Sequence, residues 1–382
     1  MGELYAPSRE KNNGAFSVRD IISVAGMRYA SRESSNSTDD YMRTYNVMRV
    51  GDIAFEGHTS NEFAFGRFVE NDLGDGIVSH VFVVLRPLPG RRYDLAFWKE
   101  AIHDEFLMKR ILARSTKRST MMHEIVVSDF LKEVFAVPSL SEQQKIGRFF
   151  STLDSLIAAA ERQEGLLKQK KQAYLQLMFP QEGEAQPRLR FSGFNGQWQQ
   201  RQLGEVAEIV GGGTPDSSNA DYWDGDIDWY IPSEIGESRI AQASTRKITR
   251  EGLNHSSARL LPAGSILFTS RASIGLMAFI SHPSATNQGF QSLIPNGEVD
   301  PDFLYALGPR ISRYAKKHAA GSTFIEISGS SLAKAPLRIP KLPEQRLIGQ
   351  FFSTFDKIIS AVEQQIESLQ MAKAAYLQRM FV

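Results

Sequence analysis

A stretch of forty residues occurs twice in this chain, and this repeat constrains the possible fold more than any other feature. The stretch 140–179 matches the stretch 342–381 at 22 of 40 positions, with a constant offset of 202 residues. A repeat of about 200 residues is too long to be the unit of a solenoid. It therefore predicts two duplicated domains, each followed by a copy of the same segment.

Both copies have the pattern of a long amphipathic helix. In the second copy the apolar residues alternate in steps of four and three, with Lys373 in one gap, and Glu164 and Lys171 interrupt the same pattern in the first copy. This spacing is typical of a coiled-coil seam. Ser141, followed by a glutamine three residues later, predicts a capping box at the start of the first helix. Since each apolar stripe needs a partner, we expect the two helices to pack antiparallel. Two unrelated helices, each lying on its own domain, are the alternative.

The segments between the helices contain short strand-like runs, Gly/Pro turns and a few helical stretches. We therefore expect an α/β fold: two globular mixed α/β domains, joined by two helices in an antiparallel coiled coil with an internal pseudo-twofold repeat. The expected parts are a first domain at 1–139, a central helix at 140–180, a second domain at 181–341 and a C-terminal helix at 342–382. The stretch 191–215 has no counterpart at the front of the first domain, so we expect that domain to be short at its N-terminus.

Composition excludes several kinds of chemistry. The chain has no cysteine, so it has no disulfide, no thiolate metal site and no cysteine nucleophile. No signal peptide and no apolar run of about 18 residues is present, and we expect a soluble, cytoplasmic protein. The sequence contains no nucleotide-binding glycine motif, no zinc-protease motif and no nucleophile elbow. We accordingly expect no catalytic residue, no metal and no cofactor.

The net charge of +1 gives the whole chain no electrostatic preference for nucleic acid. Basic residues nevertheless gather in equivalent places in the two halves, each time just before a Ser/Thr loop. The candidates for DNA contact in these clusters are Lys109, Arg110, Arg114, Lys117 and Arg118 in the first half and Arg313, Lys316 and Lys317 in the second. A single charge run is usually a solvated helix face. Two in equivalent places are better explained by contact with phosphate groups.

Several motifs together resemble one known family. Both helices begin with the pattern "EQ…IG.FFST.D" and end with "YLQ.MF", and the second domain carries "LGEVAEIVGGGTP", "ILFTSRASIG", "TNQGF" and "GSTFIEIS". This set, which extends over nearly the whole chain, resembles the specificity subunit of type I restriction–modification enzymes. The resemblance implies that each domain reads one half of a split sequence in double-stranded DNA. It also implies that the paired helices set the spacing of the half-sites and dock two modification subunits, which carry the methyltransferase activity, and that restriction subunits join this core.

The resemblance also suggests residues for these roles. Arg271, Asn287, Gln288 and Thr323 lie in the signature loops of the second domain, and we expect them near the DNA. The patches at the starts of the two helices are the expected docking surface for modification subunits, with Gln143, Phe149, Phe150, Gln345, Phe351 and Phe352 as candidate contacts. The alternative is a non-catalytic coiled-coil scaffold whose two modules bind a partner other than DNA, and the near-zero net charge slightly favours it.

Overall fold

The chain divides into two compact units in the computed structural model. Unit 1 consists of Met1–Ala160 with Gln365–Val382, and unit 2 of Glu161–Gln364. The boundaries of the units fall inside the two long helices, so each unit contains a globular part and a portion of both helices. The structure describes residues 1–30, 38–61, 63–89, 93–119, 122–134, 136–236, 238–321 and 325–381.

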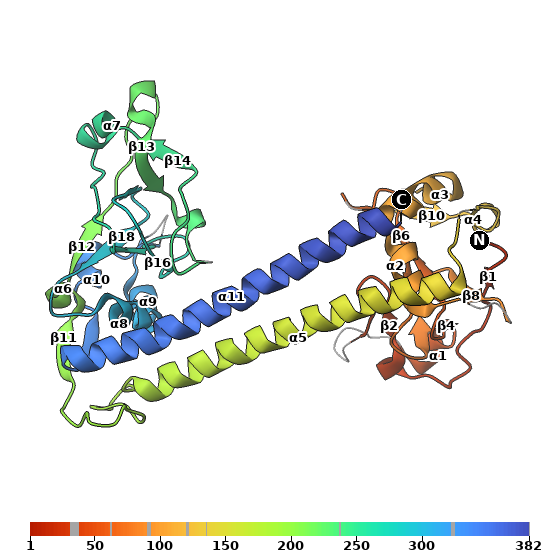
Figure 1. The fold of residues 1–382 in the computed structure, drawn as a ribbon, viewed down its shortest axis with the longest axis horizontal. Helices are drawn as coiled ribbons and strands as arrows, with labels where there is room; N and C mark the ends of the chain where they lie inside the picture. The colour runs from red at the N-terminus through yellow and green to blue at the C-terminus, as the bar shows by residue number, and fades with distance from the viewer. Residues whose placement is uncertain are drawn as a thin grey trace. The chain divides into compact units, whose positions relative to one another are not determined.

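The two repeated stretches form the long helices α5 (Leu140–Met178) and α11 (Leu342–Met380), drawn in Figure 1. Helix α5 begins at Leu140, two residues earlier than a cap at Ser141 predicts. The side chain of Ser139, rather than that of Ser141, accepts a hydrogen bond from the backbone N–H of Glu142 at 3.4 Å. The predicted helix is therefore correct and the predicted cap residue is wrong.

Matched pairs of side chains join α5 to α11 in both units. The pairs in unit 1 are Phe149 with Tyr376, Phe150 with Phe381, and Asp154 with Lys373. In unit 2 the residues 202 positions away form the same pairs with the two helices exchanged: Phe351 with Tyr174, Phe352 with Phe179, and Asp356 with Lys171. Residue numbers rise along one helix as they fall along the other, so the helices run antiparallel within each unit.

A four-stranded antiparallel sheet forms the centre of each unit, and its strand order is the same in both. In unit 1 the order is β1 (Tyr5–Pro7), β8 (Val84–Pro87), β5 (Ile53–Glu56) and β6 (Arg67–Glu70). In unit 2 it is β12 (Ala207–Gly211), β18 (Gln291–Pro295), β15 (Ile266–Phe268) and β16 (Met277–Phe279). The expectation of two mixed α/β domains is confirmed at this level.

Shorter elements surround these sheets. In unit 1 they are the strand pairs β2 (Ile22–Ser23) with β3 (Arg28–Tyr29), β4 (Asn46–Met48) with β7 (Gly76–Val78) and β9 (Thr116–Arg118) with β10 (His123–Ile125), and the helices α1 (Asp39–Met42), α2 (Leu95–His103), α3 (Glu105–Ser115) and α4 (Val127–Phe130). In unit 2 they are the pair β11 (Gln199–Gln202) with β19 (Pro336–Ile339), the sheet β14 (Arg246–Ile248), β13 (Trp223–Tyr230) and β17 (Ala285–Thr286), and the helices α6 (Leu203–Val206), α7 (Arg250–Asn254), α8 (Pro301–Ala306), α9 (Gly308–His318) and α10 (Gly329–Leu332).

The first residues of the chain have a counterpart that the sequence comparison missed. The backbone N–H of Gly2 donates to Leu131 O at 2.8 Å, and 202 residues later Gly204 N donates to Ala333 O at 2.9 Å. Strand β1 therefore takes the place of β12, and the expectation that the stretch 191–215 has no counterpart is wrong for its later part. The pair β11–β19 has no counterpart among the described residues of unit 1.

The ends of the long helices are buried in the cores of the globular parts. Phe150 near the start of α5 and Phe381 just after α11 pack in unit 1 with Phe97. In unit 2, Phe352 and Phe179 pack in the same way with Phe303, which is on α8. Burying a phenylalanine side chain contributes roughly 2–3 kcal/mol, so these aromatic clusters attach the helices firmly to both domains.

Candidate nucleic-acid interface

Three of the four signature loops of unit 2 are joined by backbone hydrogen bonds at one end of its sheets. Gly213 N donates to Thr286 O at 2.9 Å, which joins the loop after β12 to the end of β17. Ser270 N donates to Gly289 O at 2.8 Å, which joins the loop after β15 to the loop after β17. Sequence stretches that begin up to 74 residues apart thus form one surface, which we call the loop cluster (residues 212–216, 269–276 and 286–290).

The described residues of the fourth signature loop, 320–321 and 325–327, lie against this cluster. Ile327 N donates to Ser270 O at 3.0 Å, and the Ser270 hydroxyl donates to the Glu326 carboxylate at 3.2 Å. Arg271 pairs with Glu326 through a backbone bridge, and its side chain is half-buried. Thr323, the predicted contact in this loop, lies outside the described residues.

The two amides of "TNQGF" have different roles. The Asn287 side chain accepts a hydrogen bond from Gly289 N at 2.8 Å, so it shapes its own turn. Gln288 is exposed, and its Oε1 accepts from the Thr214 hydroxyl at 2.7 Å. An exposed amide that is positioned by a neighbouring loop is suited to a bidentate contact with a base edge.

The predicted basic residues of the second half lie on α9, next to the loop cluster. Ile311 and Ala315 are buried, whereas Arg313, Lys316 and Lys317 are exposed on the other side of the helix. Within the described part of the chain, none of these three cations has an ion-pair partner. They form an open, positively charged face of the kind that contacts phosphate groups.

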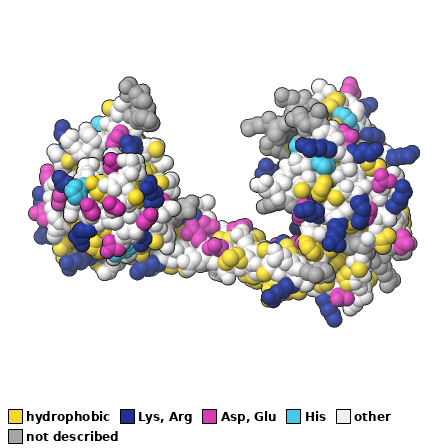
Figure 2. Space-filling model, turned by 90° about the horizontal axis from the view of Figure 1, so that it is seen from above, with side chains coloured by type: hydrophobic (Ala, Val, Ile, Leu, Met, Phe, Trp, Pro, Cys, Tyr) yellow, Lys and Arg dark blue, Asp and Glu magenta, His cyan; other side chains and the backbone are white. Residues whose placement is uncertain are grey.

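The basic residues of the first half have the same setting on α3. Lys109 and Arg110 are exposed, whereas Ile111 and Leu112 on the opposite face are buried. Arg114 differs, because its Nε donates to the Glu133 carboxylate at 2.9 Å and its charge is already neutralised. The two remaining candidates, Lys117 and Arg118, are exposed on the neighbouring strand β9. Figure 2 shows both acidic and basic side chains on the surface of each unit.

Sequence reasoning missed one loop of unit 1. Residues 57–66 join β5 to β6, as residues 269–276 join β15 to β16 in unit 2, so they take the place of the loop that carries Arg271. Each of these loops lies against a basic helix: Ala64 N donates to the Glu105 carboxylate of α3 at 3.4 Å, and Gly275 packs on Ser312 of α9. The signal was available, since "VGDIAFEG" and "AGSILFTS" are parallel and the loop follows directly.

The predicted docking glutamines lie inside the units. Gln143 is 5% exposed, and its amide joins Asp94 N at 3.2 Å to Pro138 O at 2.9 Å. Gln345 is 1% exposed and makes the corresponding bonds to Asp300 N and Pro340 O, both at 2.9 Å. Each glutamine therefore ties a long helix to the N-terminus of a domain helix, α2 or α8, and presents almost no surface to a partner.

The predicted docking phenylalanines are divided between core and surface. Phe150 and Phe352 are buried in the aromatic clusters described above. Phe149 and Phe351 are half-buried, each with its ring edge-to-face against a tyrosine of the other long helix. Of the proposed contacts, only this second pair keeps exposed surface.

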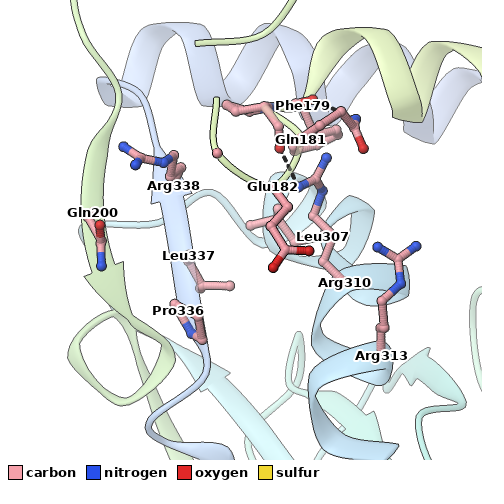
Figure 3. A pocket seen from close by; sticks show the side chains of 12 residues that line it. Phe179, Gln181, Glu182, Gln200, Leu307, Arg310, Arg313, Pro336, Leu337 and Arg338 are labelled. Atoms are coloured by element: carbon pink, nitrogen blue, oxygen red, sulfur yellow. Dashed lines mark hydrogen bonds between the residues drawn. The ribbon is translucent and has the colours of Figure 1, made fainter. Parts of the chain in front are cut away.

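A polar pocket of about 250 Å³ lies where α5 ends in unit 2. Figure 3 shows Arg310 of α9 directed at the turn after α5, where its guanidinium donates to Pro180 O. Burial and the neighbouring charge of Arg313 lower the pKa of Arg310. Glu182 lines the same opening, and the charge of Glu184 partly offsets the lowering of the Arg310 pKa. The pocket offers charge and hydrogen bonds, and through Arg310 it joins the end of α5 to α9.

The described residues contain no cluster of three or more potential metal ligands. In the same part of the chain, no helix is long and apolar enough to cross a membrane. The chemistry available at the loop cluster and the two basic helices is hydrogen bonding and charge, which suits recognition of a polyanion.

Several known proteins are similar in sequence to this chain. Residues 195–371 match the family model of the type I restriction modification DNA specificity domain. The MjaIX type I restriction enzyme specificity subunit of Methanocaldococcus jannaschii is 34% identical over 189 residues, 48% of this chain and 44% of its own length. The EcoR124I/EcoR124II specificity subunit of Escherichia coli is 29% identical over 234 residues, 59% of this chain and 54% of its own. The matched part thus spans about half the length of these curated relatives.

The fold is shared over a longer stretch. The S subunit of a type I restriction–modification system from M. genitalium covers 100% of this chain and 94% of its own, with a TM-score of 0.63 at 16% identity. A structure from a study of type I restriction–modification assembly covers 100% and 96%, with a TM-score of 0.58 at 17% identity. Residues 195–371 thus match the type I restriction modification DNA specificity domain, and the chain is similar in sequence and fold to specificity subunits of type I restriction enzymes.

Proposed function

We propose that this chain is the DNA-recognition subunit of a type I restriction–modification complex and that it reads a split target in double-stranded DNA. Unit 1 reads one half of the target and unit 2 the other. The chain is non-catalytic: methyl transfer and cleavage belong to two modification subunits and to restriction subunits, and the chain itself needs no cofactor. The complex acts on DNA in the cytoplasm.

One observation carries this proposal. In both units the loop that leads to the last strand of the four-stranded sheet, β5 to β6 in unit 1 and β15 to β16 in unit 2, lies against a helix whose outer face is basic, α3 or α9. Two copies of one surface suit two stretches of one polymer. The scaffold alternative explains the helices but gives no reason for basic helices beside both loops.

The matched side-chain pairs of α5 and α11 support the role of the helices. We propose that these helices form an antiparallel coiled coil with pseudo-twofold symmetry, whose length sets the number of base pairs between the half-sites. The same side-chain pairs occur in both units with the roles of α5 and α11 exchanged. The two units therefore offer equivalent surfaces to two identical partner subunits. Light scattering of the co-purified complex should give two modification subunits per chain, and a single one would contradict the equivalence.

Binding to DNA is tested by salt dependence. Replacing Lys316 and Lys317 with alanine should weaken binding to all duplexes alike and reduce the salt slope by roughly one to two units, because each lysine releases about one counterion on meeting a phosphate. The matched control replaces Lys341 and Lys357, which are exposed elsewhere in unit 2, and should leave the slope unchanged. Equal slopes for both variants would remove α9 from the interface. Absence of any duplex binding, with modification subunits present, would favour the scaffold alternative.

A further inference from the structure

One large apolar side chain stands on the basic face of α3. Phe106 is 67% exposed in the first turn of the helix, although the other aromatic residues near this turn are packed. Met108, Ile111 and Leu112 fill the buried face of α3, so the burial of the helix does not require Phe106. Single exposed apolar residues are common, and the surroundings of this one decide what it does.

Phe106 stands among groups that suit nucleic acid. Residues three and four positions apart lie side by side on a helix, so Lys109 and Arg110 flank the ring, and both are exposed. Its neighbour Glu105 accepts the hydrogen bond from Ala64 N, which places the first turn of α3 against the loop 57–66. The ring therefore stands between the recognition loop of unit 1 and two cations able to hold phosphate groups.

The corresponding place in unit 2 is different. Helix α9 begins at Gly308 as α3 begins at Glu105, and Pro309 then takes the place of Phe106. The residues that the fold needs repeat in both units, such as the buried Met108 and Ile311 at equivalent positions. An exposed residue that differs between the units is not needed for the shared fold, so it can contact the DNA half-site that only one unit reads.

We propose that Phe106 makes an apolar contact with a nucleobase of the half-site read by unit 1. Aromatic rings stack on bases or insert between base steps, and they also contact the methyl group of thymine. The shared chemistry is the apolar surface of a base, with the phosphates on either side held by Lys109 and Arg110. The proposal rests on the DNA-reading function proposed above.

The test compares three variants of the full chain, each assembled with modification subunits. The duplexes contain the sequence that the complex methylates. Phe106→Ala should weaken binding to the target by roughly tenfold, the scale of one lost base–aromatic contact, with the salt slope unchanged because no counterion is involved. Phe106→Tyr keeps the ring and should bind within about twofold of the original. Val134→Ala removes another exposed apolar side chain of unit 1, 85% exposed, and should have no effect.

Two further duplexes identify the form of the contact. A 2-aminopurine base that brightens with the original chain but not with Phe106→Ala indicates insertion between bases. Replacing thymine by uracil removes the methyl group, and an affinity loss only for the original chain indicates a methyl contact. Binding by Phe106→Ala equal to that by Val134→Ala, when the original chain binds the duplex, would overturn the inference. Failure of the original chain to bind any duplex would instead overturn the proposed function.

Discussion

Gly147 and Gly349 occupy places where the long helices pass very close to a domain helix. A Cβ atom on Gly349 would lie 2.5 Å from the Asp300 carboxylate and 2.7 Å from Phe303 N, and one on Gly147 would lie 2.2 Å from the Asp94 carboxylate. These carboxylates cap α8 and α2. Glycine is therefore required at these positions because nothing larger fits beside the caps.

Replacing Gly349 with alanine should accordingly destabilise unit 2, by about 1–3 kcal/mol, as overpacking does. The matched control is Gly165→Ala in α5, where a Cβ would meet nothing within 4 Å. This change should stabilise the helix by up to ~1 kcal/mol, because alanine is the better helix former. Urea unfolding followed by circular dichroism measures both, and a Gly349→Ala midpoint at or above that of Gly165→Ala would contradict the close approach.

Glu70 makes the stability of unit 1 depend on pH. Its carboxyl group is buried, and neither oxygen has a hydrogen-bond partner among the described residues. Burial, with a smaller contribution from Asp72, raises its pKa from 4.5 to about 9. Between these values the unfolded chain releases the proton and the folded chain keeps it, so stability is greatest below the unfolded pKa and falls as the pH rises.

Glu70→Gln removes this titration. The variant should lose less stability than the original chain between pH 5 and pH 9, by an amount on the order of a few kcal/mol. Melting temperatures across this range measure the difference, with the exposed Glu124→Gln as control. Parallel melting curves for Glu70→Gln and the original chain would show that the carboxyl group is ionised when folded.

At the scale of elements, two of the three interruptions in the heptad pattern have a structural explanation. Lys171 and Lys373 break the apolar seam of their own helix, and each ion-pairs with an aspartate of the other helix. Asp356 also accepts a hydrogen bond from Arg239 at 2.6 Å, so it joins α5 and a loop of the domain to α11. Lys373 in turn has a second partner, Glu100 at 3.0 Å.

Removing the two aspartates should therefore have unequal effects. Asp356→Ala leaves Lys171 and Arg239 without this partner in a site where the carboxylate side chain is 11% exposed, and should cost about 3 kcal/mol. Asp154 is 38% exposed and Lys373 keeps Glu100, so Asp154→Ala should cost about 1 kcal/mol or less. Chemical unfolding of both variants measures the two losses of stability, and equal losses would contradict the expected ranking.

How much of these elements could be predicted depended on the distance between partners in the sequence. The helices, their antiparallel packing and the basic clusters followed from periodicity and from the repeat, both of which can be read directly from the sequence. Gln143 and Gly147 both contact Asp94, the N-cap residue of α2, some fifty residues upstream, so their burial could not be read from the helix alone. The loop 57–66 was within reach because it directly follows the stretch "VGDIAFEG", although its own composition differs from that of its counterpart.

At the scale of the whole molecule, the two units each depend on both long helices. Phe381, 6% exposed, belongs to the core of unit 1 although it lies 284 positions after Phe97, its neighbour in that core. Phe381→Ala should therefore destabilise unit 1 by about 3–5 kcal/mol and leave unit 2 unchanged. Limited proteolysis, with the fragments identified by mass, should show new cleavage only in unit 1. New cleavage that began in unit 2 would contradict this assignment.

The ion pairs between α5 and α11 have a consequence for how the chain reaches its fold. In the proposed coiled coil, apolar residues that repeat every seven positions are nearly as well packed when one helix slides by a heptad, so a misaligned pair of helices competes with the native pair during folding. Such a slide moves Lys373 about 10 Å from Asp154 at ~1.5 Å per residue, and leaves an ammonium group in the seam without its carboxylate. Lys171 and Asp356 impose the same penalty in unit 2. The charged residues thus select one alignment of the two similar helices, because every other alignment leaves a charge unpaired.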